Sequence, residues 1–107
     1  MECTALVVLT TLNKEDDARR LVRGLLEARL IACGTVLPGA RSIYRWKGEV
    51  TEEDEMVVIL KTDASKWDAL ATRVREDHPY RVPELLALPV TRGLDAYLRW
   101  LGAEVEV

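Results

Sequence analysis

The fold is decided by residues 31–62, which read IACGTVLPGARSIYRWKGEVTEEDEMVVILKT. Aliphatic, aromatic and β-branched residues dominate both ends of this stretch, and Lys47-Gly48 in its middle is typical of a hairpin turn. Pro38-Gly39 interrupts the first arm and predicts a bulge or bend. The stretch therefore predicts one long antiparallel hairpin, with an acidic run between Glu49 and Glu55 on its returning arm.

A strand and a helix are predicted on the N-terminal side of the hairpin, and a helix, a strand and a final helix on its C-terminal side. Residues 4–11, TALVVLTT, predict a strand that is buried on both faces. Apolar residues then recur at helical spacing from Ala18 to Ala28. After the hairpin, Ser65 and Asp68 resemble a capping pair for a helix that ends at His78-Pro79. Residues 83–91 predict a strand, and residues 94–101 a short terminal helix.

This order of elements, βαββαβ followed by a helix, defines the fold class. Right-handed crossovers in the two βαβ halves predict an α+β, ferredoxin-like sandwich with a four-stranded antiparallel sheet, both main helices on one face and an extra C-terminal helix. The chain has 107 residues without a repeat or a Gly/Ser-rich linker, so we expect a single domain over residues 1–107.

Composition and charge exclude several classes of protein. The chain is 49% hydrophobic and 31% charged, which is typical of a packed globule, and its net charge of −3 argues against a nucleic-acid partner. The longest apolar run, Ala5 to Leu9, is much shorter than a membrane span, and no secretory leader is visible. We therefore expect a cytoplasmic protein without a membrane partner, in which Cys3 and Cys33 are reduced thiols.

Catalytic patterns are weak in this sequence. Cys33 and His78 would form a nucleophile and its base only if the fold brought them together. The structural alternatives are a small buried thiol and a histidine that packs at a helix end. We therefore predict that the protein is not an enzyme. A different role is expected for four aromatic residues, which predict a seam between subunits: Tyr44, Trp46, Tyr97 and Trp100.

Three groups of short motifs stand out when they are read together. They are Ile31-Ala32-Cys33 with Leu37-Pro38-Gly39 and residues 42–48; Leu60-Lys61-Thr62; and His78-Pro79-Tyr80 with Val82-Pro83-Glu84 and Leu88-Pro89-Val90. In this combination the sequence resembles the CutA divalent-cation tolerance proteins. The resemblance extends from about Leu6 to Leu101 and so covers nearly the whole chain.

The resemblance implies a homotrimer similar in shape to the PII signalling proteins, in which the long hairpin edges pair between subunits. It implies a role in the response to divalent metal ions, copper above all, through metal binding. It also implies a ligand-binding cleft between subunits that contains Cys33, Lys61, Tyr80 and Glu84. The alternative is a PII-like sensor whose cleft binds a small anionic metabolite near Lys61.

A copper site is associated with some members of this family, and its three positions correspond here to Thr10, Asp77 and His78. A hydroxyl and a carboxylate replace two soft or borderline ligands, and both suit copper(I) poorly. We therefore expect a weak site in which His78 and Asp77 bind copper(II) or zinc, since imidazole and carboxylate serve both ions.

Overall fold

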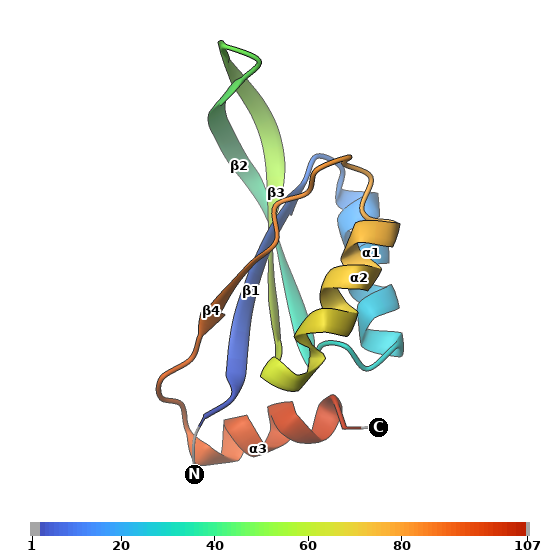
Figure 1. Cartoon of the computed structure of the whole chain (residues 1–107), viewed down its shortest axis with the longest axis vertical. Helices are drawn as coiled ribbons and strands as arrows, with labels where there is room; N and C mark the ends of the chain where they lie inside the picture. The colour runs from blue at the N-terminus through green and yellow to red at the C-terminus, as the bar shows by residue number, and fades with distance from the viewer. Residues whose placement is uncertain (1–2, 107) are drawn as a thin grey trace.

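The computed structural model describes residues 3–106 and has the predicted order of elements (Figure 1). Its strands are β1 (Ala5–Leu12), β2 (Cys33–Trp46), β3 (Glu49–Asp63) and β4 (Leu86–Pro89). Its helices are α1 (Glu15–Glu27), α2 (Trp67–Asp77) and α3 (Asp95–Glu104), and a single 3-10 turn, η1 (Ala64–Lys66), precedes α2. The strand order is β2-β3-β1-β4 and every neighbouring pair is antiparallel, which confirms the ferredoxin-like α+β prediction.

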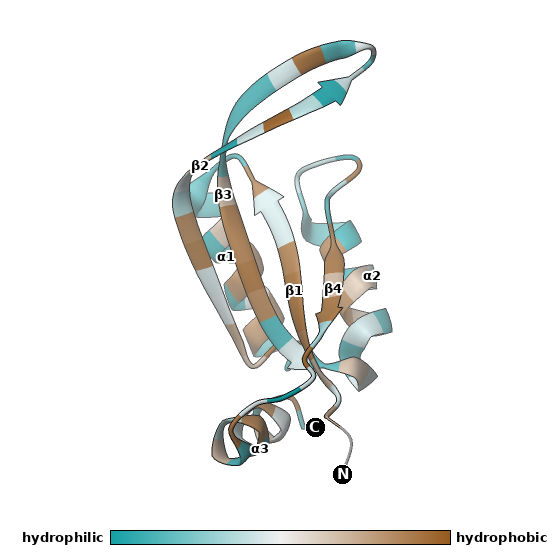
Figure 2. Ribbon diagram, turned by 90° about the vertical axis from the view of Figure 1, so that its left-hand side faces the viewer, coloured by the Kyte–Doolittle hydropathy of each residue, from teal (hydrophilic) through white to brown (hydrophobic). Residues whose placement is uncertain are grey.

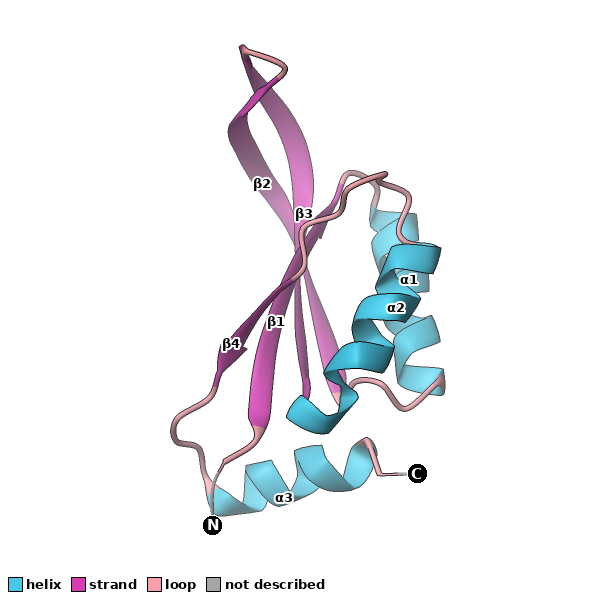
Figure 3. Cartoon of the chain, in the orientation of Figure 1, coloured by secondary structure: helices cyan, strands magenta, loops and turns pink. Residues whose placement is uncertain are grey.

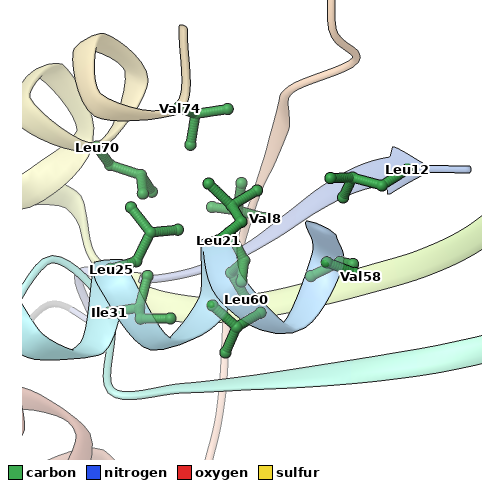
Figure 4. Packing of buried hydrophobic residues seen from close by; sticks show 11 residues of the cluster. Val8, Leu12, Leu21, Leu25, Ile31, Val58, Leu60, Leu70 and Val74 are labelled. Atoms are coloured by element: carbon green, nitrogen blue, oxygen red, sulfur yellow. The ribbon is translucent and has the colours of Figure 1, made fainter. Parts of the chain in front are cut away.

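The main core lies between one face of the sheet and the helices α1 and α2, which pack side by side on that face (Figure 3). Side chains from β1 and β3 meet the apolar stripes of both helices there (Figure 4). The residues at its centre are Val8, Leu12, Leu25, Leu60 and Leu70, all fully buried. A smaller apolar cluster, formed by Ala5, Ala32, Leu101 and Val105, attaches α3 across the end of the sheet.

None of the described helices covers the opposite face of the sheet, and we call it the open face. Val8 and Leu12 of β1 are fully buried, whereas Val7 and Leu9, which point the other way, are only half-buried. The prediction that β1 is buried on both faces is therefore wrong for residues 3–106 of a single chain, because none of them covers the second face. The open face is nevertheless apolar (Figure 2), and its members are Val7, Leu9, Leu37, Val57, Ile59, Leu86 and Leu88.

The β2–β3 hairpin projects well beyond the rest of the sheet and gives the molecule a long axis of 46 Å. Lys47 and Gly48 form its turn with φ of 49° and 82°, a left-handed pair that matches the twist of the two strands. The register between β2 and β3 shifts between Leu37 and Ala40, which confirms the predicted bulge at Pro38-Gly39. β3 also continues through the acidic run, because Arg41 on β2 pairs with Glu52 and Asp54.

Two predicted details differ from the structure. β4 spans only Leu86–Pro89 rather than residues 83–91. Pro83 has no N–H to donate to a ladder at the start of that segment, whereas beyond Pro89 the Val90 N–H still donates to the Ala5 carbonyl at 3.1 Å. The predicted cap pair at the second helix is also wrong. Asp63 accepts a hydrogen bond from the Ser65 backbone N–H, so the cap acts on η1, and α2 begins after it.

Candidate functional site

The polar residues singled out by the sequence lie in two clusters, one near the C-terminal end of β3 and the other level with its middle. The first, which we call the lysine cluster, consists of Cys33, Lys61 and Tyr97. Cys33 and Lys61 are register partners in β2 and β3. Tyr97 of α3 reaches them from the end of the sheet, because α3 crosses there and is anchored by Leu101.

The contacts of the lysine cluster converge on the Tyr97 hydroxyl. Lys61 Nζ donates to this oxygen at 3.4 Å and lies 5.6 Å from the centre of the Tyr97 ring. Cys33 Sγ lies 3.8 Å from the same oxygen. Tyr97 also packs against Trp100, with ring centres 5.5 Å apart. The cluster therefore holds an ammonium ion over an aromatic ring, next to a thiol that is half-buried.

The second cluster, the histidine cluster, consists of Thr11, Glu55, His78 and Tyr80. The ring of His78 closes the C-terminal end of α2 against β1: Nε2 lies 2.9 Å from the carbonyl oxygen of Thr11. Nδ1 accepts a hydrogen bond from the Tyr80 backbone N–H at 3.0 Å. These partners assign the neutral tautomer with the proton on Nε2, which donates to Thr11. Tyr80 in turn donates its hydroxyl to the buried carboxylate of Glu55 at 2.6 Å.

Burial controls the ionisation of this cluster. Desolvation lowers the pKa of His78 below its ordinary value, against the opposing influence of its hydrogen bond to Thr11 and of the negative charges of Glu55 and Asp17. Burial and the hydrogen bond to Glu55 raise the pKa of Tyr80. The histidine is therefore neutral and the tyrosine protonated near pH 7, as their hydrogen bonds require.

These contacts do not fit a preformed metal site at His78 and Asp77. Both ring nitrogens of His78 are already engaged, and the Asp77 carboxylate accepts from Arg73 Nε at 2.6 Å. Thr10 is fully buried. Within residues 3–106, no group of three or more His, Cys, Asp or Glu side chains is arranged to hold a metal ion. Metal binding by His78 and Asp77 stays a prediction, and it requires His78 to release one of its two partners.

The structure separates the predicted nucleophile from its base. His78 contacts Thr11, which is level with Val57 in β3, whereas Cys33 is level with Lys61. Four residues of strand span about 13 Å, so the two side chains lie at different ends of the sheet. The hypothesis of a catalytic nucleophile and base, which needs Cys33 and His78 in contact, is wrong for a single chain.

The four residues predicted for the intersubunit cleft are also divided within one chain. Cys33 and Lys61 are together, but Tyr80 is bonded to Glu55, six residues from Lys61 along β3 and about 20 Å away. Glu84 is exposed in the segment before β4. A cleft that holds all four needs residues from two chains, as the sequence prediction specified.

Apart from Thr11, which contributes only its backbone carbonyl, two residues of these clusters were not predicted as site residues. Tyr97 was assigned to a subunit seam, and its contact with Lys61 depends on how α3 crosses the sheet end, which helical spacing does not specify. Glu55 was assigned to a solvated acidic run, although it is only 5% exposed. Its position directly before the apolar run from Met56 was the available signal, since that run marks where the hairpin enters the core.

No helix among residues 3–106 has the length and hydropathy to cross a bilayer. Cys3 and Cys33 are both free thiols, as the sequence predicted.

Comparison with known proteins gives a consistent result over the whole chain. Residues 6–104 match the family model described as CutA1 divalent ion tolerance protein. The divalent-cation tolerance protein CutA of Pectobacterium atrosepticum is 47% identical over 103 residues, which cover 96% of this chain and 94% of that protein. The protein of the same name from Thermus thermophilus is 46% identical over 95 residues, 89% of this chain and 92% of its own length.

Solved structures agree with the sequence matches. The crystal structure of CutA from Xylella fastidiosa superposes with a TM-score of 0.94 at 38% identity, covering 96% of this chain and 99% of that one. A structure described as the periplasmic divalent cation tolerance protein CutA from Archaeoglobus fulgidus gives a TM-score of 0.92 at 30% identity, covering 95% and 99%. The match of fold, length and sequence shows that this chain belongs to the CutA1 divalent ion tolerance protein family.

Proposed function

We propose that the protein acts in the tolerance of divalent cations as a homotrimer and catalyses no reaction. The observation that carries the proposal is family membership over nearly the full chain, together with relatives named for divalent-cation tolerance. The separation of Cys33 from His78 supports a binding role rather than a catalytic one. We keep the cytoplasm as the proposed location.

The open face supports the proposed assembly. Leu37, Leu86 and Leu88 are 45%, 58% and 50% exposed, and the aromatic side chain of Trp46 is 55% exposed on the hairpin. An apolar sheet face of this kind, bordered by the unpaired edges of β2 and β4, favours association. Three identical chains in a closed ring would cover each such face and edge once.

Growth under metal stress tests the proposed role. The chain is expressed in a bacterium whose own CutA-family gene has been deleted, and growth is measured at rising copper(II) and zinc concentrations. We expect the chain to restore tolerance, whereas a variant that is stable but no longer assembles is expected to fail. Unchanged sensitivity in cells that contain the assembled protein would contradict the proposed role.

Direct metal binding is a separate part of the proposal and needs its own measurement. Calorimetric titration with copper(II) and zinc compares the wild type with His78→Ala and with Asp77→Asn. Because both nitrogens of His78 are engaged, we expect binding in the micromolar range or weaker, and the loss of its heat in His78→Ala. Equal heats in all three proteins would remove His78 and Asp77 as ligands.

The second candidate function is a sensor that binds a small anionic metabolite. Lys61 favours it, since a half-buried ammonium ion attracts anions and repels metal cations. A thermal-shift screen with nucleotides and small carboxylates separates the two functions. A ligand at 100 times its dissociation constant stabilises by about 2.7 kcal/mol, which is readily detected.

A further inference from the structure

Lys61 is a half-buried cation without an opposite charge beside it. Among residues 3–106, the ion pairs within 4.0 Å all involve arginines, and none involves Lys61. The residues beside it on the open face are Val7, its register partner in β1, and Ile59, two residues before it in β3, and both are apolar. This ammonium ion is therefore not neutralised by a neighbouring carboxylate and can attract an anion.

Tyr97 holds this cation in position. The ammonium group has three N–H donors, and the single hydrogen bond to the Tyr97 hydroxyl occupies one of them at 3.4 Å. The ring of Tyr97 lies 5.6 Å from Nζ, and Trp100 packs behind that ring. The remaining donors are therefore held in place on rigid elements, which lowers the entropic cost of binding an anion.

We propose that Lys61 and Tyr97 form a receptor for a carboxylate group. A single ammonium ion and a hydroxyl suit a monoanion, whereas phosphate recognition typically uses the fork of arginine or a helix N-terminus. The apolar floor and the aromatic pair suit a carboxylate that is attached to an apolar body. Cys33, which shares the Tyr97 hydroxyl, lines the receptor and does not act as a metal ligand there, because Lys61 repels cations.

The carboxylate has two possible sources, and only one of them rests on the proposed trimer. Glu84 of a second copy is the first source, because Glu84 is exposed and makes no ion pair within residues 3–106. Within one chain, Lys61 lies level with Leu88, which is four residues, or about 13 Å, along the chain from Glu84. A free small carboxylate is the second source. The chemistry at Lys61 is the same in both cases.

Titration with benzoate tests the receptor. Sodium benzoate replaces sodium chloride at constant ionic strength, neutral benzamide serves as the matched ligand, and binding is followed by NMR. If the source is a free carboxylate, we expect benzoate but not benzamide to bind the wild type. Lys61→Met should weaken this binding at least tenfold and Tyr97→Phe severalfold, while the control Lys66→Met leaves it unchanged.

A double-mutant cycle tests the other source. If Glu84 of a second copy occupies the receptor, the effects of Glu84→Gln and Lys61→Met on the stability of the assembled protein are not additive, and benzoate binds Glu84→Gln but not the wild type. The proposal is overturned if the two effects add and benzoate binds neither protein. The mass of each sample is measured alongside, so a monomeric protein that still binds benzoate contradicts the trimer and not the receptor.

Discussion

At the scale of single residues, two buried threonines differ in one respect. Thr10 and Thr62 are both fully buried on the helix-covered side of the sheet. Thr62 donates its hydroxyl to the carbonyl of Leu30 at 2.7 Å, whereas the Thr10 hydroxyl has no hydrogen-bond partner within residues 3–106. A buried polar group without a partner destabilises the folded state. Replacing each threonine by valine is therefore expected to change the free energy of unfolding in opposite directions.

Thr10→Val is expected to raise the free energy of unfolding by about 1 kcal/mol, because it removes an unbonded hydroxyl with little change of shape. Thr62→Val is expected to lower it by about the same amount, because it breaks a hydrogen bond and leaves the Leu30 carbonyl without that donor. Urea unfolding of the wild type and both variants at one protein concentration checks this. Destabilisation by both changes would mean that Thr10 has a partner.

His78 predicts a dependence of stability on pH. Its folded pKa is lowered below 6.5 by burial, so below pH 6.5 the unfolded chain binds a proton that the folded chain does not. Stability is complete above pH 6.5 and falls as the pH decreases towards the folded pKa, with a slope of at most about 1.4 kcal/mol per pH unit and chain.

Urea unfolding between pH 7.5 and pH 5.5 measures this slope. His78 is the only histidine of the chain, so His78→Gln is expected to remove most of the dependence in that range. Equal slopes in the wild type and the variant would show that His78 keeps an ordinary pKa in the folded protein.

The contacts of individual side chains are also what the sequence did not predict. The motif that contains His78 and Tyr80 indicated an important position, but its hydrogen bonds to Thr11 and Glu55 join residues far apart in the chain. Spacing along the sequence carries no information about such partners. For the same reason Lys61 was predicted as a site residue and its contact with Tyr97 was not.

At the scale of elements, α1 packs tightly against β2 at Gly34. A Cβ atom at this position would lie 2.7 Å from Val22 Cγ1 and 3.1 Å from Leu60 Cδ2, closer than packed atoms tolerate. The absence of a side chain at Gly34 thus allows α1 to pack closely on the sheet. Gly24 on α1 is different, since its added Cβ would meet only Arg73 Nη2 at an ordinary 3.5 Å.

Gly34→Ala is expected to destabilise the protein by about 1–3 kcal/mol, because the added methyl overpacks the interface between α1 and β2. Gly24→Ala is the matched control and is expected to be neutral or to stabilise by up to about 1 kcal/mol through helix propensity. Thermal or urea unfolding of both variants provides the comparison. A neutral Gly34→Ala would show that α1 shifts freely on the sheet.

Elements with strong local patterns were predictable from the sequence, and those shaped by partners were less so. The hairpin turn at Lys47-Gly48 and the bulge at Pro38-Gly39 follow from local backbone preferences, and both were predicted correctly. The acidic run has low intrinsic strand propensity, yet it is part of β3, held by cross-strand pairs with Arg41. β4 is shorter than predicted, and at the start of the predicted segment Pro83 has no N–H to donate to a ladder.

At the scale of the whole molecule, the disagreement about β1 is informative. The sequence of residues 4–11 is that of a strand buried on two faces, but a single chain covers only one of them. The pattern and the structure agree if a second copy covers the open face, around Leu9 and Leu88. On the proposed assembly, the apolar residues of β1 serve contacts between copies as well as the core of one chain.

The mass of the protein in solution tests this account most directly. Light scattering or sedimentation at micromolar concentration is expected to give three times the mass of one chain. Leu88→Asp is expected to reduce that mass, because it places a charge on the open face. The matched control is Arg92→Asp on the exposed loop after β4, which is expected to leave the mass unchanged. A stable wild-type monomer at that concentration would contradict the account.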